Sequence, residues 1–158
     1  MRSVMETGTI EREIHIEATP DVVYQVVSRP EHLREWWPDD AELDPVPGGT
    51  GVIRFGDAAS PDSVVEQLTV VEADPPRRFS FRWVTDEGAV AGPGTSLLVT
   101  FDLEPSGAGT LLRLSETGFR EKGWEAAVLE EQLREHVSGW DYFLPRLVGY
   151  VGRLVSTP

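Results

Sequence analysis

Several residue types that direct a chain towards particular chemistries are absent. The sequence has no cysteine, which excludes disulfides, thiolate nucleophiles and cysteine-ligated zinc. It has no asparagine and therefore no N-glycosylation acceptor. No apolar run reaches the roughly 18 residues of a membrane span, and the first residues are polar where a signal peptide needs an apolar stretch. We therefore expect a cytoplasmic protein without membrane insertion.

Positive charge is also scarce. The formal net charge is −13, from 27 acidic and 14 basic side chains. Binding to a phosphate backbone or an anionic lipid surface requires clustered positive charge that releases counterions, and the arginines here are scattered. We therefore expect no nucleic-acid partner.

The residues that are present predict one α+β domain over residues 8–155. The 158 residues, 40% of them apolar, are enough for a single core. Residues 9–18 alternate between apolar and polar side chains, which predicts a strand with one wet face. Residues 19–37 predict two short helices, because Pro20 suits a first helical position and Pro30 ends the first helix.

The rest of the chain predicts a sheet and a long helix. Five longer segments and the strand over residues 9–18 give six strands, and a short one near residues 41–46 would make seven. Their short connections favour an antiparallel meander. The longer segments are residues 51–57, 63–74, 77–86, 96–105 and 109–118. A helix lying across the sheet is predicted by apolar residues spaced alternately four and three apart: Leu133, Val137, Trp140, Leu144, Leu147, Val151 and Leu154.

Two adjacent tryptophans, Trp36 and Trp37, lie in the segment HLREWWPDD. Side by side on a helix they point about 100° apart, so one flat core face cannot take both equally. We expect one ring to pack inward, with Trp37 favoured. The other ring either forms the rim of a cavity or is simply exposed.

Four segments in this order resemble those of the heat-shock chaperone ATPase activator homologues, within the START and birch-pollen-allergen (SRPBCC) superfamily. They are IEREIHIEATPDVVYQVVSRPEHLREWW, ADPPRRFSFRW, TFDLEPSGAGTLLRLSETGF and HVSGWDYFLPRL. The resemblance covers roughly residues 8–155. It implies a helix-grip fold, in which a curved antiparallel sheet wraps around a long C-terminal helix and leaves a cavity for a small apolar or amphipathic molecule.

An aromatic wall is the main candidate for binding. Alternation places Phe79, Phe81 and Trp83 on one face of a strand, and each ring either fills the core or lines the cavity. With residues from neighbouring strands, the rim and the helix, the candidate ligand-binding set is Arg12, Trp37, Phe55, Phe79, Phe81, Trp83, Phe101, Leu112, Glu116, Trp140 and Leu144.

Two charged members of this set, Arg12 and Glu116, lie on the inward face by strand parity. In the helix-grip fold the first and last strands pair antiparallel, which would bring the two side chains together. They are expected to form a partly buried ion pair or a group that anchors a ligand.

Signals for catalysis, metals or cofactors are weak. His15, His32 and His136 are not spaced as a metal pair such as HExxH, and the segment GGTG lacks the GK[ST] of a phosphate loop. Glu116 with His136 would form an acid and base pair if both reach one cavity. We therefore predict no catalytic residue, no metal ligand and no cofactor.

Three functions fit these observations. The favoured one is a cytoplasmic binding module for a small hydrophobic or aromatic ligand, with homodimer formation left open. The alternatives are an enzyme of the polyketide cyclase or aromatase type and a co-chaperone-like domain that binds proteins through its acidic outer face. A dry cavity favours binding, whereas a converging acid, base and water site favours catalysis.

Overall fold

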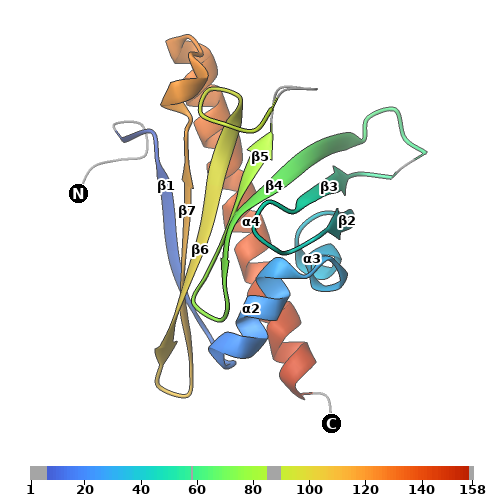
Figure 1. Cartoon of the computed structure of the whole chain (residues 1–158), viewed down its shortest axis with the longest axis vertical. Helices are drawn as coiled ribbons and strands as arrows, with labels where there is room; N and C mark the ends of the chain where they lie inside the picture. The colour runs from blue at the N-terminus through green and yellow to red at the C-terminus, as the bar shows by residue number, and fades with distance from the viewer. Residues whose placement is uncertain (1–6, 58, 85–89, 157–158) are drawn as a thin grey trace.

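A curved antiparallel sheet of seven strands forms the centre of the molecule (Figure 1). The structure, a computed structural model, describes residues 7–57, 59–84 and 90–156. From one edge to the other the strands are β1 (Ile10–Ile16), β7 (Gly109–Thr117), β6 (Ser96–Ser106), β5 (Arg78–Val84), β4 (Val64–Asp74), β3 (Thr50–Phe55) and β2 (Asp40–Leu43). The predicted antiparallel meander is confirmed, and β2 is its seventh strand. Residues 85–86 of the strand expected over 77–86 lie outside the described residues.

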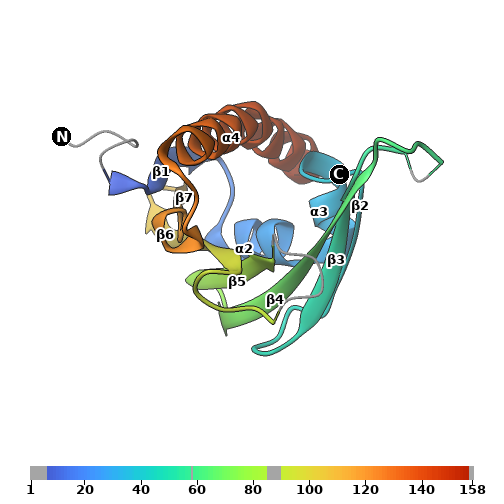
Figure 2. The same ribbon diagram turned by 90° about the horizontal axis from the view of Figure 1, so that it is seen from above.

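Two short helices, α2 (Pro20–Ser28) and α3 (Pro30–Trp36), follow β1 as predicted. Each begins with a proline, whose fixed φ suits the first turn and whose missing N–H costs nothing there. Arg29 separates them with extended backbone, because a residue that precedes proline is driven out of the helical region. Figure 2 shows α2 inside the curve of the sheet and α3 beside the β2 edge.

The long helix α4 (Ala126–Ser156) lies across the open side of the curved sheet (Figure 2). A single 3-10 turn, η1 (Arg120–Lys122), leads into it from β7. The apolar stripe is buried at Leu133, Trp140, Leu144, Leu147 and Val151, whereas Leu154 is exposed. No helix in the described part of the chain is long and apolar enough to cross a membrane.

Helices α2 and α4 cover different parts of the concave face of the sheet. The candidate site lies in the part that α4 covers. Helix α2 contacts β5, β6 and β7, and Tyr24 of α2 meets Phe79 edge to face at 6.0 Å between ring centroids. Burying a side chain such as Phe79 contributes roughly 1.5–3 kcal/mol. The contacts of α2 leave the inner face near β3 and β4 to be covered by α4.

Candidate ligand-binding site

A pocket of about 360 Å³ lies between α4 and the β3, β4 and β5 strands. Aromatic rings make up much of its wall, and acidic side chains and one histidine supply its charged groups. Its lining residues are Trp37, Phe55, Val64, Glu66, Trp83, Glu135, His136, Gly139, Trp140 and Phe143. Of these three strands, only β5 is among the main contacts of α2.

The candidate binding residues divide into pocket and core. Four of them line the pocket, namely Trp37, Phe55, Trp83 and Trp140. Five others are buried in the core: Phe79, Phe81, Phe101, Leu112 and Leu144. Phe79 packs against Tyr24 of α2. Phe81 contacts Trp37 and Phe101 contacts Trp36, so α2 and the tryptophan pair fill space that was expected to be cavity.

Both tryptophans of the pair are buried, so the expected rim or exposed position for one of them is wrong. Trp36 is 0% exposed and Trp37 is 3% exposed. Helix α3 ends at Trp36, and Trp37 has a non-helical backbone (φ −113°, ψ −94°), so the helical angle between neighbouring side chains does not apply. The two rings stack at 6.2 Å between centroids. Of the two, only Trp37 is a lining residue, as favoured.

Trp37 is the centre of the aromatic wall. Its ring stacks on Trp140 with centroids 5.5 Å apart and meets Trp83 edge to face at the same distance. Phe55 lies edge-on to it at 6.0 Å. Pairs in such arrangements contribute about 0.5–1.5 kcal/mol each beyond the area that they bury. The wall is therefore held in shape by its own packing.

A buried carboxylate, Glu116 on β7, fixes two pocket residues of α4. The two carboxylate oxygens lie 2.9 and 3.1 Å from Nδ1 of His136, and the indole N–H of Trp140 donates to one of them at 2.9 Å. Because an ionised carboxylate only accepts, Nδ1 of His136 carries the hydrogen. Glu116 is fully buried, so it orients His136 and Trp140 from behind the wall. The sequence analysis named Glu116 and His136 as an acid and base pair if both reach one cavity, and the structure places the two side chains in contact.

The surroundings raise the pKa of His136. Burial is the largest single influence and lowers the pKa, but the hydrogen bond to Glu116 and the charges of Glu116, Glu135 and Glu66 together outweigh it. His136 therefore stays protonated to a higher pH than an exposed histidine. Below its pKa it forms a charged pair with Glu116.

The predicted pairing of Arg12 with Glu116 is wrong. Strands β1 and β7 pair antiparallel as expected, but the register sets Ile10 opposite Glu116. Arg12 instead donates from Nε to Asp141 of α4 at 2.8 Å, in a partly exposed pair. Its long side chain reaches solvent beyond the edge of the sheet, whereas the carboxylate of Glu116 is held inside by His136.

Glu66 on β4 brings a second carboxylate to the pocket. Burial raises its pKa, and the nearby Trp83 indole and His136 only partly oppose this. Nε1 of Trp83 is buried without a hydrogen-bond partner among the described residues. The Trp83 N–H therefore lies inside the pocket wall and is not exposed to a ligand.

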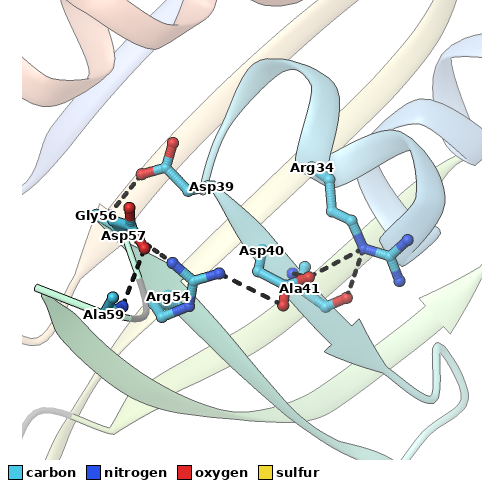
Figure 3. Close-up of polar contacts among 8 residues, drawn as sticks. All are labelled: Arg34, Asp39, Asp40, Ala41, Arg54, Gly56, Asp57 and Ala59. Atoms are coloured by element: carbon cyan, nitrogen blue, oxygen red, sulfur yellow. Dashed lines mark hydrogen bonds and ion pairs between the residues drawn. The ribbon is translucent and has the colours of Figure 1, made fainter.

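A polar network on the other face of β3 fixes the strand that carries Phe55 (Figure 3). The register sets Asp40 of β2 opposite Arg54. Asp40 pairs with Arg34 at 3.3 Å and with Arg54 at 3.7 Å, and Arg54 also donates to the carbonyl of Gly56. Because neighbouring side chains in a strand point to opposite faces, the guanidinium of Arg54 is engaged away from the pocket.

Sequence reasoning missed several lining residues, although weak signals for two of them exist. Glu66 shares strand parity with the buried Leu68 and Val70, so its inward position follows from alternation. Phe143 follows Trp140 by three positions on a helix, which places both on one face. Within the described ranges, no group of three His, Asp or Glu side chains is arranged to hold a metal ion.

Helix α4 continues through Pro145, and we predict that it bends there rather than ending and starting again. Pro145 has no N–H for the carbonyl of Asp141 and crowds that carbonyl. Replacing Pro145 by alanine is expected to raise the free energy of unfolding by about 1–3 kcal/mol. A straighter helix should also shift Trp140 and Phe143 and change the affinity for the neutral dye N-phenyl-1-naphthylamine, measured by fluorescence titration.

Gly152→Ala is the matched control for this substitution, because an added Cβ there meets open space. It should stabilise α4 by about 1 kcal/mol without altering dye affinity. If Pro145→Ala moves only the melting temperature, Pro145 does not set the width of the pocket.

The fold and the pocket together define a class: helix-grip α+β domains with a cavity between the curved sheet and the C-terminal helix. The sequence profile of the family described as activator of Hsp90 ATPase homolog 1-like protein matches residues 17–152. The chain belongs to this family, and the resemblance seen in its sequence segments is confirmed.

Solved structures share this fold at low sequence identity. Protein MLL2253 from Mesorhizobium loti is 22% identical, with a TM-score of 0.73 over 92% of this chain and 97% of that chain. The Aha1 dimer from Colwellia psychrerythraea is 20% identical, with a TM-score of 0.69 over 90% and 95%. DynU16, from the dynemicin biosynthetic locus, is 19% identical, with a TM-score of 0.68 over 91% and 47%. No curated protein sequence matches significantly.

Proposed function

We propose that the chain is a binding module that holds a small hydrophobic or aromatic ligand between the sheet and α4. The observation that carries the proposal is the pocket of about 360 Å³ with its wall of aromatic rings. Ligand sites are concave, mostly apolar and supplied with a few polar groups that orient the ligand. Here His136 and Glu66, which both line the pocket, are the orienting groups.

Introducing a larger side chain into the pocket tests the proposal without removing any contact that the unaltered protein makes. Gly139 lines the pocket, and a Cβ added to it meets nothing within 4 Å. In the unaltered protein, N-phenyl-1-naphthylamine is expected to bind and to perturb tryptophan emission, because Trp83 and Trp140 flank the site. Gly139→Leu should weaken this binding at least roughly tenfold, since the leucine side chain takes the place of the dye.

Gly152→Leu is the control, because it makes the same change on the same helix, away from the pocket residues and in open space. Both variants replace glycine by a better helix former, so both should be at least as stable as the parent. The proposal fails if the dye binds without perturbing tryptophan, or if the two variants bind it equally well.

An enzyme of the polyketide cyclase or aromatase type is the alternative. It is supported by His136, a titratable group in the pocket wall that is oriented by a buried carboxylate. The same carboxylate also accepts from Trp140 and has no exposed surface. Glu116 therefore holds His136 in place but does not itself reach a ligand, which favours binding over acid and base catalysis.

A homodimer and a cytoplasmic location complete the proposal. The Colwellia psychrerythraea protein of the same fold is a dimer, which supports pairing of two copies of this chain.

A co-chaperone-like role is supported by the description of the family. If that role holds, a chaperone should be retained by the intact acidic outer face and also by the Gly139→Leu variant.

A further inference from the structure

The charged groups around the pocket are mostly negative. Glu66, Glu135 and His136 are its charged or titratable lining residues. In the part of the chain that the structure describes, neither lysine nor arginine lines it. The balance of these groups decides which ligand charge the pocket accepts.

The positive charge of His136 is already matched. Glu116 accepts from Nδ1 with both oxygens, at 2.9 and 3.1 Å, so the two side chains form a pair without net charge. Glu66 and Glu135 remain as carboxylates without an opposite charge in the lining. Glu66 is half-buried on the wall, and Glu135 is exposed at the mouth.

The arginines nearest in sequence to pocket residues are engaged elsewhere. Arg54, next to Phe55, is held by Asp40 and the Gly56 carbonyl on the other face of β3 (Figure 3). Arg82, next to Trp83, lies within 3.4 Å of the hydroxyl of Ser96. Arg134, next to Glu135, pairs with Glu130 at 2.8 Å. None of these three guanidinium groups belongs to a lining residue that would balance Glu66 and Glu135.

The wall itself favours a cation. The faces of tryptophan and phenylalanine rings attract ammonium groups, most strongly where the site is desolvated. Among the aromatic lining residues, Phe55, Trp83 and Phe143 are only partly buried and can contact a ligand. Trp37 and Trp140 are buried and stack on each other behind them. A net charge of −13 also raises the local concentration of cations.

The geometry points to an organic cation as the ligand class: an amine or quaternary ammonium compound with an apolar or aromatic body. This inference rests on the proposed function and adds the charge of the ligand to it. The aromatic wall receives the apolar body, and Glu66 and Glu135 balance the cationic head.

An isosteric pair of probes tests the charge alone. Phenyltrimethylammonium and tert-butylbenzene have the same shape and differ by one positive charge, and benzenesulfonate supplies an anion. Titration calorimetry with the full chain is expected to give about tenfold tighter binding for the cation than for the neutral isostere. The anion should bind more weakly than both.

Glu66→Gln isolates the carboxylate, because it removes the charge and keeps the shape. It should reduce the affinity for the cation several-fold and leave that for the neutral isostere unchanged. Glu72→Gln, on the same strand but paired with Arg78 outside the pocket, should change neither. Affinity for the cation should also rise with pH, as Glu66, whose pKa is raised by burial, ionises and as His136, which faces Glu116, Glu66 and Glu135, loses its proton.

The outcomes separate this inference from the proposed function. If the cation and the neutral isostere bind equally, or if the neutral one binds more tightly, the charge inference is overturned and the apolar binding function stands. If neither probe binds and Gly139→Leu leaves dye binding unchanged, both are overturned. Tighter binding of the cation that Glu66→Gln abolishes supports both.

Discussion

Replacing Glu116 by glutamine is expected to shift the pKa of His136 from above its ordinary value to below it. Burial alone lowers this pKa, and the hydrogen bond and charge of Glu116 are what mainly reverse the effect. A neutral amide at this position cannot supply the charge, so burial then dominates. Titration of the three histidines by NMR would report the change, with the partly exposed His15 as an internal reference.

The same substitution should cost roughly 3–5 kcal/mol of unfolding free energy near pH 6, because it removes one partner of a buried charged pair. A histidine whose folded pKa is raised contributes stability that is fully present below its unfolded pKa and is lost as the pH rises through its folded pKa. The difference between the parent and Glu116→Gln should therefore shrink as the pH rises through the raised pKa of His136 in the folded parent.

Glu13→Gln is the matched control. Glu13 pairs with Arg113 at 2.8 Å, but both side chains are more than half exposed. Solvent screens such an exposed pair, so the substitution should change stability little. Equal melting temperatures for the two variants at pH 6, or a His136 pKa that stays raised in Glu116→Gln, would contradict a buried charged pair.

Features that depend on local spacing could be predicted from the sequence. Alternation placed Phe79 and Phe81 on the inward face of their strand, and both are buried, because side chains alternate along a strand whatever lies above them. Pro20 marked the start of α2 and Pro30 marked its end, because a proline constrains its own backbone and that of its predecessor. Family resemblance supplied the order in which the strands pair.

Features that depend on which element covers which surface could not be predicted. No local signal states that α2 turns into the curve of the sheet and leaves only the β3 to β5 end open. Strand parity predicted that Arg12 and Glu116 lie on one face of the sheet. Each pairs instead with a residue of α4: Arg12 with Asp141, and Glu116 with His136. Long-range packing therefore decided both the extent of the pocket and the identity of its buried pair.

Substitution of Trp36 or of Trp37 by alanine is expected to lower the free energy of unfolding by similar amounts but to change the affinity for a ligand differently. Each is buried, so replacement by alanine should cost roughly 3–5 kcal/mol. Trp36 donates from its indole N–H to the carbonyl of Val26 at 3.0 Å, which ties α3 to α2, and it is not among the lining residues. Trp36→Ala should therefore leave the affinity for N-phenyl-1-naphthylamine nearly unchanged.

Trp37→Ala should weaken the same binding roughly tenfold, because it removes the ring on which Trp140, Trp83 and Phe55 pack. Denaturant unfolding and dye titration would be measured on both variants at one pH. Where an alanine variant does not fold, the pair Trp36→Phe and Trp37→Phe gives the same comparison with smaller cavities. Equal losses of dye affinity at the two positions would show that the tryptophan pair acts only as core. A loss confined to Trp37 would show that adjacent tryptophans serve separate roles, because the end of α3 at Trp36 frees the next residue to enter the pocket wall.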